Sequence, residues 1–186
     1  MGETTPADAV ASFGEPTERR EEAADPDLTD NYDERQPRPP ALRRAALKGE
    51  FERLLYSFSR ATMVMLPNQA TARIRQLDLA FWKGKLVAYQ FSSSFAEDAT
   101  DVDESKVGSF KRGHTTTTDV LNQLGTPGGQ AVYPYVARQG TRAYFYQFAM
   151  AGPRKGQVTL KHLELLFTPA DHLDQVYLVT DIKDGS

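Results

Sequence analysis

The sequence spells the same helix-and-stop phrase twice, and this repetition limits the possible folds more than any other feature. Residues 113–127 read GHTTTTDVLNQLGTP, and residues 2–16 read GETTPADAVASFGEP. In each copy two glycines stand twelve positions apart (125 − 113 = 12; 14 − 2 = 12), and a proline follows the second glycine. Gly and then Pro after an apolar turn are typical helix stops. The repetition predicts a duplicated folding unit.

We expect a short capped helix in each copy. Thr5 and Thr116 are placed as N-caps, and Asp8 and Asp119 follow three residues later, which is the spacing of a capping box. The apolar residues of the two helices are expected to face a core; they are Val10, Phe13, Val120, Leu121 and Leu124.

A second pair of matching segments supports the duplication. Residues 75–81 read RQLDLAF and residues 161–167 read KHLELLF, each alternating apolar and mostly polar side chains up to a final Phe. Such alternation predicts a half-buried strand. We expect residues 71–81 and 85–95 to form a hairpin. The predicted core side chains of the two matching strands are Leu77, Leu79, Phe81, Leu163, Leu165 and Phe167.

The phrase Gly-x-Thr-Thr, Asp-Val, Leu-Gly-x-Pro, followed by an aromatic strand and an alternating strand, resembles the SmpA/OmlA (BamE-like) lipoproteins of Gram-negative outer membranes. The likeness covers residues 98–182 and, more loosely, residues 2–16 and 51–95. The tandem arrangement is similar to the β-lactamase-inhibitory protein fold. The resemblance implies an α+β fold with two tandem ααβββ-like repeats, whose antiparallel sheets are each covered by helices on one face.

We place the first repeat at residues 1–95 and the second at residues 96–186. The second repeat is expected to open with a helix over residues 100–111, whereas the first has no counterpart before Gly2. We therefore expect that a preceding segment, with a signal peptide and the lipid-bearing cysteine that the resemblance implies, belongs upstream of Met1. Residues 17–40 are charged, proline-bearing and poor in apolar side chains, which predicts a flexible insertion.

Charge and composition exclude several classes of function. Residues 1–40 carry four basic and eleven acidic residues (4 − 11 = −7), and residues 41–186 carry eighteen basic and fourteen acidic residues (18 − 14 = +4). This mild balance does not predict nucleic-acid binding. The chain has no cysteine, which excludes disulfides, thiol catalysis and thiolate metal sites.

The sequence offers no constellation for catalysis. His114, His162 and His172 do not stand at metal-ligand spacing, and no nucleophile elbow, phosphate loop or dinucleotide fingerprint is present. We expect a protein that is not an enzyme, with no catalytic residues, no cofactor and no metal. The alternating strand pattern places His162 on an open sheet face.

The resemblance implies a scaffold or assembly factor at the periplasmic side of the outer membrane, held there by a lipid anchor and bound to another envelope protein. The alternative is a secreted or periplasmic inhibitor or sensor that binds a partner enzyme through the concave sheet face. Either role needs exposed residues for a partner. The candidate partner-binding residues are Tyr133, Tyr135, Tyr144, Tyr146 and His162.

Overall fold

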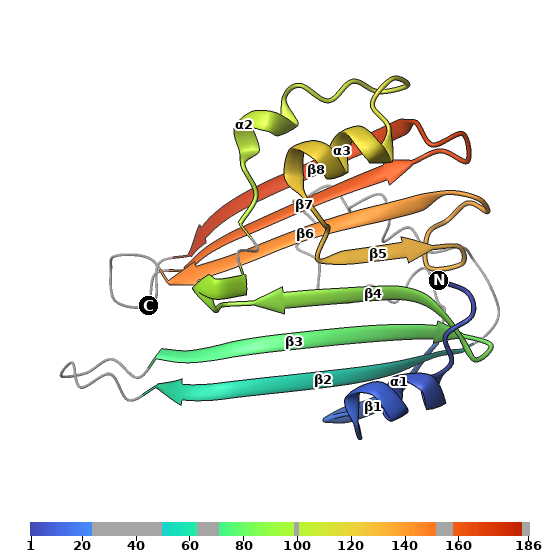
Figure 1. The fold of residues 1–186 in the computed structure, drawn as a ribbon, viewed down its shortest axis with the longest axis vertical. Coiled ribbons are helices and arrows are strands. Elements are labelled where there is room, and N and C mark those ends of the chain that lie inside the picture. The colour runs from blue at the N-terminus through green and yellow to red at the C-terminus, as the bar shows by residue number, and fades with distance from the viewer. Residues whose placement is uncertain (24–49, 63–70, 99–100, 152–157, 184–186) are drawn as a thin grey trace.

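A computed structural model describes residues 1–23, 50–62, 71–98, 101–151 and 158–183. Three short α-helices and a 3-10 turn accompany eight strands in these ranges (Figure 1). In chain order the elements are α1 (Pro6–Phe13), β1 (Glu18–Ala23), β2 (Glu50–Thr62), β3 (Thr71–Trp82), β4 (Lys85–Ser93), η2 (Ala96–Asp98), α2 (Glu104–Val107), α3 (Thr117–Leu124), β5 (Gly129–Val132), β6 (Arg142–Ala151), β7 (Val158–Phe167) and β8 (Leu173–Lys183).

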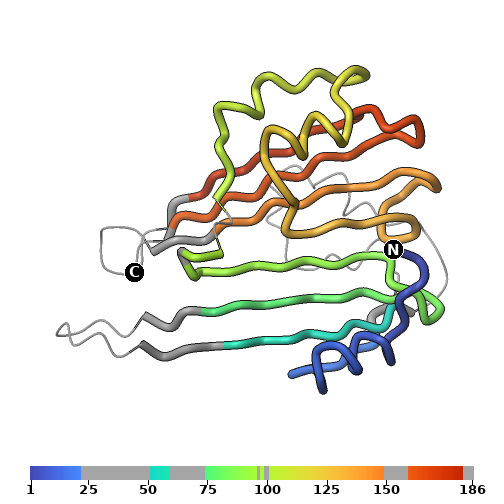
Figure 2. The backbone as a smooth tube through the Cα atoms, viewed as in Figure 1, coloured from blue at the N-terminus to red at the C-terminus, as the bar shows by residue number. Residues whose placement is uncertain are grey.

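The strands form a single eight-stranded sheet in which each strand pairs with the next in the chain, from β1 to β8. Every pairing is antiparallel. Figure 2 shows the same order by colour, from the N-terminal strands to the C-terminal strands. The sheet is therefore a meander that needs no crossover connection.

This architecture contradicts the predicted α+β class with two ααβββ-like repeats. The segments directly after the two glycine stops, Glu18–Ala23 and Gly129–Val132, form strands, so each capped helix precedes four strands rather than three. The pairing of β4 with β5, in which Ala88 lies opposite Ala131, joins all strands into one sheet. The expected helix over residues 100–111 is reduced to α2, which Asp103 caps. The division into two domains stays a prediction.

The prediction of a flexible insertion over residues 17–40 is wrong at its beginning. Glu18–Ala23 pairs with β2 as β1, and Arg19 lies 3.3 Å from Glu52 across the strands. Ladder hydrogen bonds to a neighbouring strand stabilise this charged segment without a large apolar contribution. The rest of the predicted insertion, residues 24–40, lies outside the described residues.

The predicted helix caps are confirmed in both copies. The Thr5 hydroxyl accepts from the Asp8 amide, and the Asp8 carboxylate accepts from the Thr5 amide; Thr116 and Asp119 repeat this arrangement. The two stop glycines also match, with φ 81° and ψ −167° at Gly14 and φ 79° and ψ −166° at Gly125. Because φ is positive there, glycine is the residue that adopts this backbone without strain.

The two helices are also tied to the sheet in the same way. The Gly2 amide donates to the Leu86 carbonyl at 3.1 Å, and the Gly113 amide donates to the Leu173 carbonyl at 2.8 Å. In return Leu86 donates to the carbonyl of Thr4 at 2.9 Å, as Leu173 does to that of Thr115 at 2.7 Å. The duplicated phrase therefore occupies matching surroundings, which supports a copied unit of helix and strands.

The three α-helices pack on one face of the sheet. Ala9 of α1 lies in a cluster with Leu54, Leu79 and Phe81, and Val120 of α3 lies in a second cluster with buried strand residues such as Phe167. Five of the six predicted strand residues are buried, whereas Leu77 is half-buried. Phe13 and Leu121 are exposed, which corrects their prediction as core residues. Both belong to helices of only eight residues, and Phe13, the last residue of α1, keeps a ring contact with Tyr56 of β2 at 5.6 Å between centroids.

The opposite face carries an apolar cluster of its own. Four alanines, Ala80, Ala88, Ala131 and Ala143, stand opposite one another across four strands. Residues Tyr135 and Val136 of the β5–β6 connection pack over these small side chains. Because alanine side chains are small, the β5–β6 connection can approach the sheet closely at this row. The larger polar residues of this face lie at other positions along the strands.

Candidate functional site

The face of the sheet opposite the helices carries a row of polar and aromatic side chains, which Gly129 of β5 interrupts. We call it the helix-free face, because the described helices all pack on the other side. Residues that lie opposite one another in an antiparallel sheet point to the same face. By strand pairing the row runs through Asp78, Gln90, Phe145, Glu164 and Tyr177, from β3 to β8. The row therefore crosses both halves of the sheet, of which the first half is α1 with β1–β4 and the second half is α2 and α3 with β5–β8.

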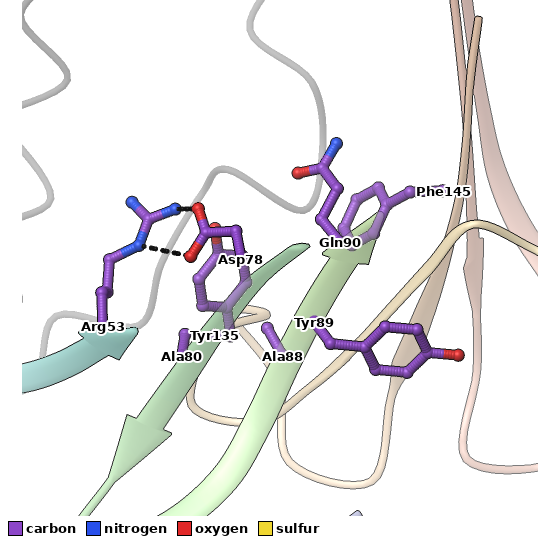
Figure 3. Close-up of a pocket in the computed structure, with 8 residues that line it drawn as sticks. All are labelled: Arg53, Asp78, Ala80, Ala88, Tyr89, Gln90, Tyr135 and Phe145. Atoms are coloured by element: carbon purple, nitrogen blue, oxygen red, sulfur yellow. Dashed lines mark hydrogen bonds and ion pairs between the residues drawn. The ribbon is translucent and has the colours of Figure 1, made fainter. Parts of the chain in front are cut away.

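At one end of the row Arg53 and Asp78 form a two-pronged ion pair. The Arg53 Nε donates to Asp78 Oδ1 at 3.2 Å, and a second guanidinium nitrogen of Arg53 donates to Asp78 Oδ2 (Figure 3). The side chains are 27% and 26% exposed, so the pair is partly shielded from water. Because two hydrogen bonds join the guanidinium and the carboxylate, both side chains are held in one orientation. The pair therefore presents a rigid polar group at this end of the row.

A small hollow lies beside this ion pair. It is lined by Arg53, Asp78, Ala80, Ala88, Tyr89, Gln90, Tyr135 and Phe145, and its volume is about 10 Å³. Figure 3 shows Gln90 and Phe145 together above the sheet, whereas Tyr89 points away from them. A hollow of this size holds about one water molecule. The hollow is too small for an organic cofactor or substrate.

The other end of the row is organised around His162. The His162 Nδ1 lies 3.0 Å from Gln147 Nε2, and His162 Nε2 lies 3.8 Å from the carboxylate of Glu164. The His162 ring stacks on the Phe145 ring with 6.4 Å between the ring centroids. It meets the Tyr177 ring edge-on with 6.2 Å between the centroids. The imidazole is thus held by a hydrogen bond and two aromatic neighbours while 26% of its side chain stays exposed.

Burial and charge shape the hydrogen-bonding groups near His162. Glu164 is 1% exposed, so it acts from beneath the surface and does not reach a partner itself. Burial raises the pKa of Tyr177, and the Glu164 carboxylate raises it further. The Tyr177 phenol therefore remains a neutral donor and acceptor at neutral pH. This cluster can recognise polar groups on another molecule.

The structure separates the five predicted partner-binding residues. His162 lies on the helix-free face, and Tyr133 and Tyr135 belong to the β5–β6 connection that packs on the same face. Tyr144 and Tyr146 are each 5% exposed and lie in the core between the sheet and α3. Their burial corrects the expectation that these two rings are exposed. The partner-binding role of the predicted residues stays a prediction.

The sequence reasoning missed Arg53, Asp78, Gln90 and Tyr177. A signal for Asp78 was present, because the matching segments RQLDLAF and KHLELLF carry an acid at the same place, Asp78 in the first and Glu164 in the second. In the structure Asp78 lies opposite Leu55, and Glu164 lies opposite Phe145. Arg53 and Tyr177 had no such signal. Their positions on the face follow from pairings that the sequence does not print.

Two further features concern the described residues only. His, Asp and Glu side chains do not gather there in any group of three that could hold a metal ion. None of the described helices combines the length and apolarity that crossing a lipid bilayer requires.

No protein-family model and no curated protein sequence matches the chain. Among solved structures, a candidate beta-lactamase inhibitor protein from Streptococcus mutans is similar with a TM-score of 0.43 and 9% sequence identity. The similarity covers 95% of this chain and 82% of that one. The resemblance to the SmpA/OmlA lipoproteins is thus not accompanied by a family match, and a structural likeness at this level does not establish a family.

Proposed function

We propose that this chain is a non-enzymatic protein that binds a partner protein through the helix-free face of its sheet. The observation that carries the proposal is the fixed row of polar and aromatic side chains on that face. Arg53 is held by Asp78, and His162 is held by Gln147 between two aromatic rings. Arg and Tyr are enriched among the residues that contribute most to protein interfaces.

The size of the face also favours a folded partner. From β2 to β8 the sheet spans six strand spacings, roughly 29 Å at about 4.8 Å each. A stable interface buries about 800 Å² on each partner, and a sheet of this width offers such an area. Because the side chains are already held in place, binding costs little side-chain entropy.

Both roles that the sequence left open use such a face. An inhibitor or sensor would cover a partner enzyme with it, and an envelope scaffold would hold a neighbouring protein. Attachment to the outer membrane and periplasmic localisation are part of the second role and rest on the sequence resemblance. We infer protein binding as the function common to both roles.

The proposal is tested by affinity capture with matched variants. His162→Ala and Tyr177→Ala alter the helix-free face, whereas Val176→Ser changes an exposed residue of the same strand on the opposite face. A protein that is captured by the wild type and by Val176→Ser, and lost with both face variants, supports the proposal. The purified partner then allows a measured Kd and, if it is an enzyme, an inhibition assay. A partner retained by both face variants and lost with Val176→Ser would refute it.

A further inference from the structure

The helix side of the first half contains an open groove with an apolar and a polar part. The apolar part is formed by Phe13 of α1, Tyr56 and Phe58 of β2, Leu77 of β3 and Phe91 of β4, and the polar part by Glu15, Thr17, Ser57, Arg75 and Gln76. We call it the first-half groove; its volume is about 370 Å³. Phe13 and Phe58 are 59% and 54% exposed, which is unusual for two phenylalanines on the same side of a sheet.

Strand pairing identifies the matching place in the second half. Glu18, thirteen residues after Thr5, pairs with Leu55, and Gly129, thirteen residues after Thr116, pairs with Phe145. Leu55 and Phe145 therefore match, as do their neighbours Tyr56 and Tyr146. The same comparison on the next strands matches Leu77 with Leu163 and Phe91 with Leu178.

In the second half this place is filled. Residues 101–110, which we call the covering segment, place Val102, Val107 and Phe110 in one cluster with Tyr146 and Leu163. Figure 1 shows α2, the helical part of this segment, beside α3 over the late strands, while α1 accompanies the early strands.

The covering segment is held by polar contacts at its beginning. Lys161 Nζ lies 2.8 Å from the Asp101 carboxylate and 3.3 Å from that of Glu104. The Thr180 hydroxyl donates to Glu104 at 3.0 Å. A short segment with one helical turn is thus sufficient to occupy this place when its apolar side chains meet the sheet.

Among the described residues of the first half no segment takes the place of the covering segment, and the residues there differ accordingly. Leu163 is fully buried, whereas the matching Leu77 is half-buried. The Tyr146 hydroxyl donates to the Gly125 carbonyl at 2.9 Å, whereas the buried Tyr56 hydroxyl has no hydrogen-bond partner among the described residues. Tyr56 therefore has an unused donor beside the groove.

The residue of the first half that matches Lys161 is already paired with acidic side chains. Arg75 matches Lys161, and its Nε lies 2.6 Å from Asp98, while a second guanidinium nitrogen lies 3.3 Å from Glu97. Acidic residues of a ligand are therefore not needed at this position. Within the described residues, the groove therefore offers apolar side chains and the Tyr56 hydroxyl, edged by polar residues such as Glu15 and Gln76.

We propose that the first-half groove binds a short segment of a partner protein that carries apolar side chains at the spacing of Val102, Val107 and Phe110. The internal copy displays the kind of chain that fits this surface. A short segment laid into an apolar groove is a common mode of peptide recognition. This site lies on the opposite face from the partner site proposed above, so the two proposals are tested independently.

The test is an NMR titration of the isotope-labelled full chain with a synthetic peptide of residues 101–112. The expected result is a set of saturable amide shifts at Phe13, Tyr56, Phe58, Leu77 and Phe91. A control peptide with Asp at its three apolar positions should leave these signals unchanged. Phe58→Asp should weaken peptide binding about tenfold or more, and because Phe58 is exposed this variant should fold normally. Val176→Ser, on the same face of the second half, should bind as the wild type does.

Three results would overturn the proposal. The first is the absence of groove shifts at millimolar peptide. The second is shifts confined to β6–β8, which would mean that the peptide only displaces the chain's own covering segment. The third is a dimer in sedimentation experiments that Phe58→Asp abolishes, which would identify the occupant as a second copy of this chain rather than a partner protein.

Discussion

The hydroxyl of Tyr146 donates a 2.9 Å hydrogen bond to the backbone carbonyl of Gly125, the residue that ends α3. The bond ties the helix end to the centre of the sheet. Burial raises the pKa of Tyr146, so its phenol stays protonated and remains a donor throughout the neutral range. At the matching position Tyr56 lies 5.6 Å from the ring of Phe13 and has no such bond among the described residues.

This difference predicts opposite effects of the same substitution. Tyr146→Phe should lower the free energy of unfolding by about 1 kcal/mol, because a hydrogen bond in a buried site is lost. Tyr56→Phe should leave stability unchanged or raise it slightly, because a buried hydroxyl without a partner is removed. Urea denaturation of both variants measures the contrast. Equal losses would show that the two tyrosines do not differ in bonding.

The capping boxes predict a matched pair of destabilised variants. Thr5→Ala and Thr116→Ala should each cost about 1 kcal/mol, because each removes an acceptor for a helix N-terminal amide. Thr118→Ala changes an exposed residue of α3 two positions after Thr116. This variant is the control, and its free energy of unfolding should not fall. Thermal unfolding followed by circular dichroism measures all three variants. A control that loses as much as Thr116→Ala would contradict the capping role.

The two halves should also tolerate cavity formation differently. Leu163→Ala should cost about 2–5 kcal/mol, because a fully buried side chain leaves a cavity. Leu77→Ala should cost clearly less, since Leu77 borders the open first-half groove. Chemical denaturation of both variants under identical conditions gives the comparison. A larger loss for Leu77→Ala would mean that the groove is closed in solution.

Acid should weaken one ion pair in a defined range. The hydrogen bond from Arg75 lowers the pKa of Asp98 below its usual 3.8, and the Ser93 hydroxyl lowers it further. A carboxylate with a lowered folded-state pKa stabilises the protein above its unfolded pKa and loses that contribution as pH falls through the folded value. The stability gap between the wild type and Asp98→Asn should therefore be constant above about pH 5 and shrink below about pH 4. A gap that grows on acidification would contradict this assignment.

The sequence predicted the local features of this fold and failed on the long-range ones. Thr116, Asp119 and Gly125 lie within one short helix, so their spacing alone specifies the caps. The pairing of Ala88 with Ala131 joins residues far apart in the chain, and no local pattern encodes it. That pairing turns two expected sheets into one, which is why the fold class was wrong.

The candidate site was predictable to a similar degree. Alternation showed that Tyr144 and Tyr146 share a face, but it did not say which face the helices cover. For His162 the predicted open face is the one observed. Asp78 and Glu164 stand at matching positions of the duplicated strand, so a comparison of the copies on their polar side would have found them.

Site-specific photo-cross-linking can show whether a partner protein contacts the helix-free face. A benzophenone amino acid is placed at His162 in one variant and at Val176 in another, so that the probes lie on opposite faces of adjacent strands. We expect a covalent adduct with a partner protein from position 162 and none from position 176. An adduct formed only from position 176 would contradict this expectation.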